Sequence, residues 1–313
     1  MHAIAPYSIR FFDPNNTAKN IEDRYAVLNK LGAHDAYTVL CDFVRGLDDQ
    51  FSIDEVGQQV YRFFEMKTFD ATREVAGWFE SGSYGYKNDI IDIETGKVDY
   101  EKTQKHAEII RHYIRFFVPK GFNEGVALLQ TFKGNGIKTL LHDVLRAHFQ
   151  KKTTLNLQMN PLAYKKAFLD WENAYTKEIK LTKFQAMDDL ADQIKKLGHK
   201  ESQLIIKAPT KAAMGRLKDL LDPNSEEYSV VEYLSPMCAQ VKAVVELNGK
   251  KRTFTIGRPA DEQVCEIPID EEDVDFFAGN PVPKSLHKWC GVIQQELVDN
   301  IYPGMGVVAG GNI

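Results

Sequence analysis

Residues 203–221, QLIIKAPTKAAMGRLKDLL, predict a short strand, a loop and then a basic helix. The apolar run 204–206 favours a strand, and Pro209 ends it. Thr210 is a suitable N-cap, so we expect the helix to begin there. Its buried face is expected to contain Ala212, Ala213, Leu217, Leu220 and Leu221.

The same stretch carries four cations: Lys207, Lys211, Arg216 and Lys218. We expect Lys207 and Lys211 at the helix entrance, where free backbone N–H groups and the positive end of the helix dipole favour an anion such as phosphate. The alternative is an ordinary surface helix whose lysines are solvated. Local sequence does not decide between these two interpretations.

The distribution of charge along the chain favours the anion-binding interpretation. The net charge is −5, which argues against a general polyanion binder. Lys and Arg number 18 against 21 Asp and Glu in residues 1–150, 14 against 8 in residues 151–220, and 7 against 15 thereafter. One basic segment, of net charge +6, therefore lies inside an acidic chain, as expected if one surface meets nucleic acid.

Composition sets the broad class. With 313 residues and 43% hydrophobic side chains, the chain can bury a core and form two domains, which we place at residues 1–152 and 153–313. We see no apolar run of membrane-spanning length and no leader pattern, and we expect a cytoplasmic protein. The four cysteines are far apart and predict reduced, buried thiols.

Hydrophobic periodicity predicts an α+β fold, with two mixed α/β domains, antiparallel hairpins and a C-terminal amphipathic helix. The clearest hairpins are 109–132 and 241–257, the second turning at Asn248-Gly249. Further strands are expected at 38–44, 60–71, 155–162, 178–184, 229–234 and 264–269. Helices are expected late in the first 35 residues and at 138–152, 164–174, 187–197 and 285–301, and a long loop or hairpin at 77–100.

The segment 133–139, KGNGIKT, sits at an expected strand-to-helix turn and superficially resembles a phosphate loop. Ile137 separates Gly136 from Lys138, so the contiguous Gly-Lys-Thr of a nucleotide-hydrolysing loop is missing. Lys133 and Lys138 could still help to hold one DNA phosphate, or the glycines could simply let the strand meet the helix.

An alternative chemistry is suggested by Glu65-Met66-Lys67, which follows Asp54. Nucleases of the PD-(D/E)xK type use two carboxylates to hold Mg²⁺ and a lysine to orient the attacking water. The competing interpretation of Asp54, Glu65 and Lys67 is an exposed strand of alternating charge, and the usual strand-borne PD element is absent. Histidines 106, 112, 142 and 148 lack metal-ligand spacing and predict solvated or locally bonded side chains.

The order of elements in the second half resembles the RexA family, the phage-exclusion proteins of lambdoid prophages. The resemblance covers about residues 110–300 and is one of pattern rather than of long identities. Its segments are RFFVPKGFNEGVALLQTFKGNGIKTLLHDVL, LIIKAPTKAAMGRLKDLL, VKAVVELNGKKRTFTIG and SLHKWCGVIQQELV. The first 100 residues are only loosely similar.

This resemblance implies a dimeric protein that binds double-stranded DNA without strict sequence preference and acts in phage exclusion or abortive infection. It further implies a membrane-protein partner encoded nearby and a trigger from the phage or the host. Carried over by position, Lys207, Lys211, Arg216 and Lys218 would contact phosphate. Where the family is more basic, this chain has residues 212–214, Ala-Ala-Met, which would weaken binding or shift it onto Lys195, Lys196 and Lys200.

Three hypotheses follow. The first is a nonenzymatic, cofactor-free DNA-binding protein of a phage-defence system. The second is a Mg²⁺-dependent nuclease effector. The third is an adaptor that binds a phage or host protein through the acidic C-terminal surface.

Overall fold

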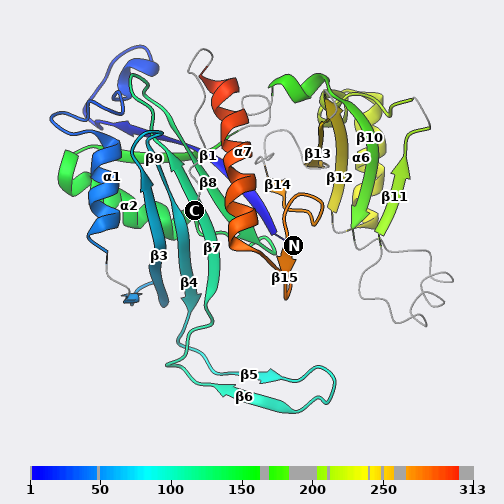
Figure 1. Ribbon diagram of the computed structural model, residues 1–313, viewed down its shortest axis with the longest axis horizontal. Helices are drawn as coiled ribbons and strands as arrows, with labels where there is room; N and C mark the ends of the chain where they lie inside the picture. Colours follow the sequence, from blue (N-terminus) through cyan, green and yellow to red (C-terminus); the bar gives the residue numbers. More distant parts are fainter. Residues whose placement is uncertain are drawn as a thin grey trace. The chain divides into compact units, whose positions relative to one another are not determined.

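The computed structural model describes residues 2–47, 50–162, 169–182, 203–209, 212–238, 240–247, 250–256 and 266–302. They form two compact units, one of residues 6–160 and one that joins residues 2–5 to the chain after residue 160. Helices and antiparallel sheets are mixed in the chain, as Figure 1 shows, so the broad α+β prediction is confirmed. The domain boundary at residue 152 stays a prediction.

The larger sheet has the strand order β14-β1-β8-β7-β4-β3-β2, and β9 also pairs with β1. Its strands are β1 (His2–Phe12), β2 (Ser52–Asp54), β3 (Gln59–Phe69), β4 (Glu74–Ser83), β7 (Ile110–Phe117), β8 (Gly125–Phe132), β9 (Asn156–Pro161) and β14 (Ile267–Pro268). The first residues of β1 pair with β14 within the second unit. β1 therefore lies in the interior of the sheet, because it has strands on both sides.

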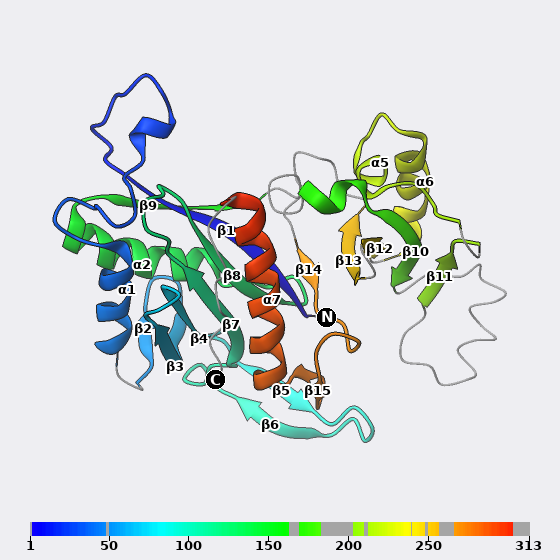
Figure 2. The same ribbon diagram turned by 45° about the horizontal axis from the view of Figure 1, so that its top comes forward.

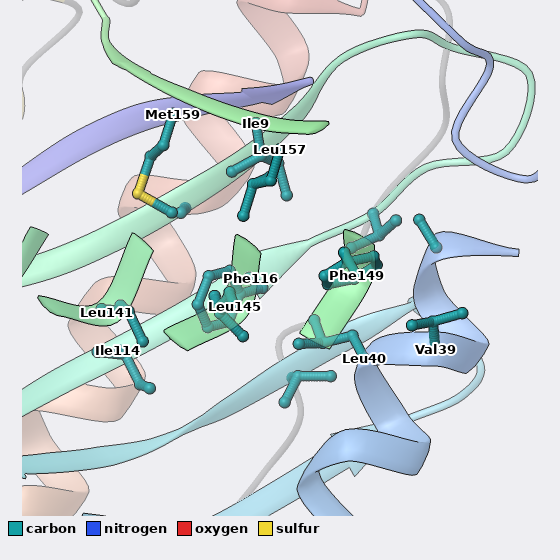
Figure 3. Packing of buried hydrophobic residues seen from close by; sticks show 14 of the residues in the cluster. Ile9, Val39, Leu40, Ile114, Phe116, Leu141, Leu145, Phe149, Leu157 and Met159 are labelled. Atoms are coloured by element: carbon teal, nitrogen blue, oxygen red, sulfur yellow. The ribbon is translucent and has the colours of Figure 1, made fainter. Parts of the chain in front are cut away.

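Two helices pack on one face of this sheet, α1 (Ala36–Arg45) and α2 (Lys138–Thr153). Helix α2 buries Leu141, Leu145 and Phe149, whose spacing of four residues places them on one side of the helix. Figure 3 shows these side chains meeting others from the sheet and from α1. A small apolar cavity remains in this core, lined in part by Leu40 and Leu145.

A two-stranded hairpin, β5 (Asn88–Ile91) and β6 (Val98–Lys102), connects β4 to β7 and projects from the end of the sheet (Figure 1). We call residues 86–106 the arm. Gly96, with φ +69°, lies in the turn at its tip, between strands paired in antiparallel register. The hairpin predicted within residues 77–100 is thus present, although residues 77–83 belong to the main sheet.

The second unit contains a four-stranded antiparallel sheet of order β11-β10-β12-β13. Its strands are β10 (Tyr175–Thr182), β11 (Gln203–Lys207), β12 (Gln240–Leu247) and β13 (Lys250–Ile256). Among the described residues of this unit, the helical elements are η2 (Leu169–Asn173), α5 (Leu217–Leu221), α6 (Glu226–Leu234), η3 (Ser235–Met237) and α7 (Pro283–Ile301). Short strands β15 (Phe276–Phe277) and β16 (Asn280–Pro281) pair with each other.

Most strand and helix predictions in regions of clear periodicity are confirmed, including both hairpins and the terminal helix. Three are wrong. Residues 38–44 belong to α1, whose N-cap Asp35 accepts a hydrogen bond from Tyr37 N, and residues 229–234 belong to α6, capped by Ser225. The first 35 residues contain β1 and only a three-residue turn of helix, η1 (Glu22–Arg24). The helix predicted at 187–197, residues 164–168 of another and the turn at 248–249 lie outside the described residues.

Of the helices in the described ranges, none combines the length and the hydropathy that a membrane span requires.

Candidate nucleic-acid interface

Residues 214–217, in the middle of the basic stretch, lie beside the start of β10. Met214 N donates to Thr176 O at 3.0 Å, and Thr176 N donates to Gly215 O at the same distance. Leu217 N donates to Ala174 O, also at 3.0 Å. These backbone groups are used by a neighbouring strand, so they cannot form the i to i−4 bonds of a helix.

This pairing corrects the prediction of a helix that begins at Thr210. Helix α5 begins at Leu217 and has five residues, and Gly215 has φ +83°, a left-handed conformation that a right-handed helix cannot contain. Lys207 ends β11, ten residues before α5. The anion site predicted at a helix entrance is therefore not formed there. Thr210 and Lys211 lie outside the described residues.

The pairing places an exposed aromatic residue beside a cation. Tyr175 and Arg216 form a β-bridge, and the Arg216 guanidinium carbon lies 5.6 Å from the centre of the Tyr175 ring. Tyr175 is 50% exposed. A guanidinium stacked on a tyrosine ring keeps its N–H donors available for phosphate oxygens, and the exposed ring offers a surface on which a base could stack.

Two lysines of the predicted set are accessible in the same unit. The Lys207 side chain is 68% exposed, and its Nζ lies 3.7 Å from Glu178 Oε1. Glu178 also approaches Lys180, with 4.0 Å between Oε2 and Nζ. Lys218 is exposed on α5. Because the Lys207 ammonium lies largely in water and is 3.7 Å from the carboxylate, the pair is weak, so Lys207 could exchange its carboxylate for a phosphate at little cost.

The remaining predicted lysines divide into two groups. Lys195, Lys196 and Lys200 lie outside the described residues. Lys133 and Lys138 belong to the unit of residues 6–160.

The glycine turn before α2 is a tight hairpin turn. Lys133 and Gly134 have φ values of +50° and +80°, and Phe132 and Asn135 exchange two backbone hydrogen bonds of 2.9 Å. Lys133 Nζ lies 5.2 Å from the centre of the Phe132 ring, and α2 begins at Lys138. Positive φ at both central residues is typical of a type I′ turn, so the glycine lets the strand reverse before the helix.

The structure does not bring the three nuclease candidates together. Asp54 on β2 pairs with Gln59 on β3, and Glu65 follows six residues along β3, about 20 Å away at the rise of a strand. The Asp54 carboxylate accepts hydrogen bonds from Val56 N and Gly57 N. Glu65 lies in a β-bulge, with φ +49°. Nor do the described residues contain any group of three or more His, Cys, Asp and Glu placed to hold a metal.

A cluster of arginines and aromatic rings on the larger sheet was missed from the sequence. Glu80 on β4 lies directly between Arg62 on β3 and Arg111 on β7 in the strand register. Glu80 accepts from Arg62 Nε at 2.7 Å and from Arg111 Nε at 2.8 Å. Both guanidiniums lie over Phe64, at 4.8 and 4.7 Å from the ring centre. The only sequence signal was the mixture of Arg and aromatic residues on three strands, and their register was unknown.

Three of the four histidines, His106, His112 and His142, are locally bonded, as predicted, whereas Nε2 of His148 is buried without a hydrogen-bond partner among the described residues. His142 is within hydrogen-bond distance of Leu157 O, and His112 of Gln130 O. Burial lowers the pKa of His112, which favours the neutral ring. His148 packs against Phe43, with 4.7 Å between ring centres.

No protein-family model matches the chain, and a search of curated proteins finds no matching sequence. The RexA resemblance therefore stays a prediction. Within the basic stretch and its neighbouring strand, the side chains best placed to meet an anion are the exposed Tyr175, Lys207 and Lys218 and the half-buried Arg216.

Proposed function

We propose that the chain binds double-stranded DNA through the phosphate backbone, without strict sequence specificity, as a protein of phage exclusion or abortive infection. What supports the DNA-binding part is the pair of exposed Tyr175 and half-buried Arg216, with Lys207 and Lys218, in the one basic segment of an acidic chain. Phosphate contacts carry no sequence information, so such a surface would tolerate different sequences. The defence role is supported by the RexA resemblance alone.

The contacts differ in the chemistry they would contribute. Arg216 presents a planar guanidinium that can donate two parallel hydrogen bonds to one phosphate, and the Tyr175 ring holds it. Lys207 and Lys218 would act as point charges along the backbone. In this proposal Arg216 makes the contact that depends on orientation, and the two lysines make contacts that depend mainly on charge.

The proposal is tested by measuring binding to a labelled duplex across a salt series. Each phosphate contact releases counterions, so the logarithm of affinity should fall with the logarithm of salt by about 0.9 per contact. Lys207→Ala with Lys218→Ala should lower the slope by roughly 2 and weaken all duplex sequences alike. Lys288→Ala, at an exposed position on α7, is the matched control and should change neither quantity.

Arg216→Lys separates orientation from charge. It keeps the charge but loses the bidentate geometry, so we expect weaker binding with little change in the salt slope. Absence of duplex binding at low salt would overturn the proposal, as would equal affinities for the wild type and the Lys207→Ala, Lys218→Ala and Arg216→Ala triple variant.

A further inference from the structure

The Tyr175 side chain is exposed on a backbone that is fixed from both sides. Tyr175 pairs with Glu246 of β12 on one side and forms a β-bridge with Arg216 on the other. The next residue, Thr176, exchanges backbone hydrogen bonds of 3.0 Å with residues 214–215. Figure 2 shows α5, which follows Arg216 in the chain, beside the end of the sheet at which β10 begins. The backbone that carries the ring is therefore already ordered, so little of its entropy remains to be lost when a ligand binds.

The ring has one close cationic neighbour and remains half exposed. The Arg216 guanidinium lies over it, with the guanidinium carbon 5.6 Å from the ring centre. Among the described residues, the Tyr175 hydroxyl forms no hydrogen bond and the ring contacts no second ring. Tyr175 is 50% exposed. Neither a buried hydrogen bond nor a place in the core accounts for a tyrosine here, and the ring keeps surface for a second planar group.

The charges beside the ring favour an anion. Within the described part of the chain, the Arg216 guanidinium forms no ion pair. On the other side of Tyr175 lies Glu246, and the exposed Lys251 of β13 lies opposite Glu246 in the strand register. The row of Arg216, Tyr175, Glu246 and Lys251 therefore carries a net positive charge, which attracts a phosphate to the neighbourhood of the ring.

A nucleotide with an unpaired base fits this pair of side chains. Every base has a π face that stacks on an aromatic ring, and a phosphate of the same strand can accept hydrogen bonds from an arginine beside that ring. In a duplex each base is paired and stacked on its neighbours, so the ring reaches the face of a base only after that base leaves the stack. Where the base is already unpaired, this cost does not arise. Lys207 and Lys218 do not distinguish the two cases, because contacts to phosphate carry no information about the bases.

We propose that the surface prefers DNA in which the duplex contains an unpaired base, at a bubble, a bulge or a single-stranded end. Tyr175 stacks on that base while Arg216 binds the adjoining phosphate. The inference rests on the proposed DNA binding and names the class of DNA that the same surface selects. Because stacking tolerates every base, the preference is one for DNA structure and not for sequence.

The test compares a fully paired, blunt-ended duplex with the same duplex carrying a short central bubble. Binding of the whole chain to each labelled substrate is measured by fluorescence anisotropy at one salt concentration. The wild type should bind the bubble substrate at least about fivefold more tightly, which is the lower end of what stacking on one base contributes.

Variants at the ring identify the cause of this ratio. Tyr175→Leu should reduce the ratio to about one, because leucine has no π face, whereas Tyr175→Phe should keep it. Tyr233→Leu is the matched control, since it replaces a tyrosine that is 70% exposed on α6, and its ratio should equal that of the wild type. The fluorescent base 2-aminopurine in the bubble gives an independent readout, because stacking on the ring changes its emission. Circular dichroism confirms that each variant is folded.

The outcomes separate this inference from the proposal on which it rests. If the wild type bound neither substrate, the proposed DNA binding would be wrong and the preference would fall with it. Equal affinities for the two substrates would refute the preference and leave duplex binding intact, as would a ratio that Tyr175→Leu does not reduce. If Tyr175→Phe lost the ratio as fully as Tyr175→Leu, the hydroxyl rather than the ring would be responsible, and stacking would be excluded.

Discussion

Arg73 donates hydrogen bonds to both carboxylate oxygens of Asp35, at 2.9 and 2.7 Å. The same carboxylate accepts from Tyr37 N at 2.8 Å, and Arg73 Nε donates to Val118 O at 2.6 Å. The pair therefore joins the start of α1 to the turn before β4 and to the end of β7. Its side chains are 14% and 25% exposed, so water screens it only in part.

Asp35→Asn is expected to lower the free energy of unfolding by about 1–3 kcal/mol near neutral pH. Burial by itself raises the pKa of Asp35, but hydrogen bonds from Arg73 and Tyr37 N outweigh it, and the pKa is lowered from 3.8. A lowered acid pKa stabilises the folded state above the unfolded-state pKa, and this stabilisation is lost as the pH falls through the folded-state value. In urea unfolding at several pH values, the free energy of unfolding should fall less steeply with decreasing pH for the variant than for the wild type. Asp99→Asn, on the exposed arm, should leave this pH dependence unchanged.

Leu145→Ala should lower the free energy of unfolding by about 2–5 kcal/mol, because it removes buried methyl groups next to an existing cavity. Leu145→Met nearly conserves volume and should cost less than about 1.5 kcal/mol. Equal losses for the two variants in denaturant titrations would contradict the packing seen in Figure 3.

Glu80→Ala should destabilise the fold by roughly 2–4 kcal/mol, since it leaves two partly buried guanidiniums without their shared carboxylate. If the three residues act as a unit, adding Arg111→Ala should restore part of the loss. A double-mutant cycle measures this coupling, and strictly additive effects would show that Arg111 and Glu80 are energetically independent.

Gly215→Ala tests the geometry that presents Arg216. The position has φ +83°, and an added Cβ would lie 2.9 Å from Glu227 Cγ, so we expect a loss of about 1 kcal/mol or more in stability. Adding Glu227→Ala should relieve the steric part but not the backbone strain. Thermal unfolding measures the stability of both variants. If the double variant were as stable as the wild type, the positive φ at residue 215 would contribute nothing to the loss.

Local pattern was sufficient for the hairpins at 110–132 and 240–256, where alternating apolar residues of strand length set both the strands and their pairing. It failed for α1, because residues 38–44 contain β-branched Thr38, Val39 and Val44 and are read as a strand unless the Asp35 cap is weighed. It failed again at Gly215, where pairing with β10 overrides a sequence that favours helix.

The candidate site depended still more on contacts between distant residues. Arg216 was identified from its charge, but Tyr175 is 41 positions earlier, and nothing in their spacing predicts the bridge between them. In the same way, Glu80 meets Arg62 and Arg111 only because three strands share one register. Charge can be counted from sequence, whereas the partners of each charge follow from strand pairing.

The interior position of β1 also constrains how the chain acquires its structure during synthesis. β1 is made before its neighbours β8, β9 and β14, which begin at residues 125, 156 and 267. Such long sequence separations slow folding, because the chain loses the entropy of loop closure before the stabilising contacts form. We therefore expect β1 to stay unpaired on the ribosome until β8 has emerged, and during that time chaperones could bind this exposed, largely apolar segment.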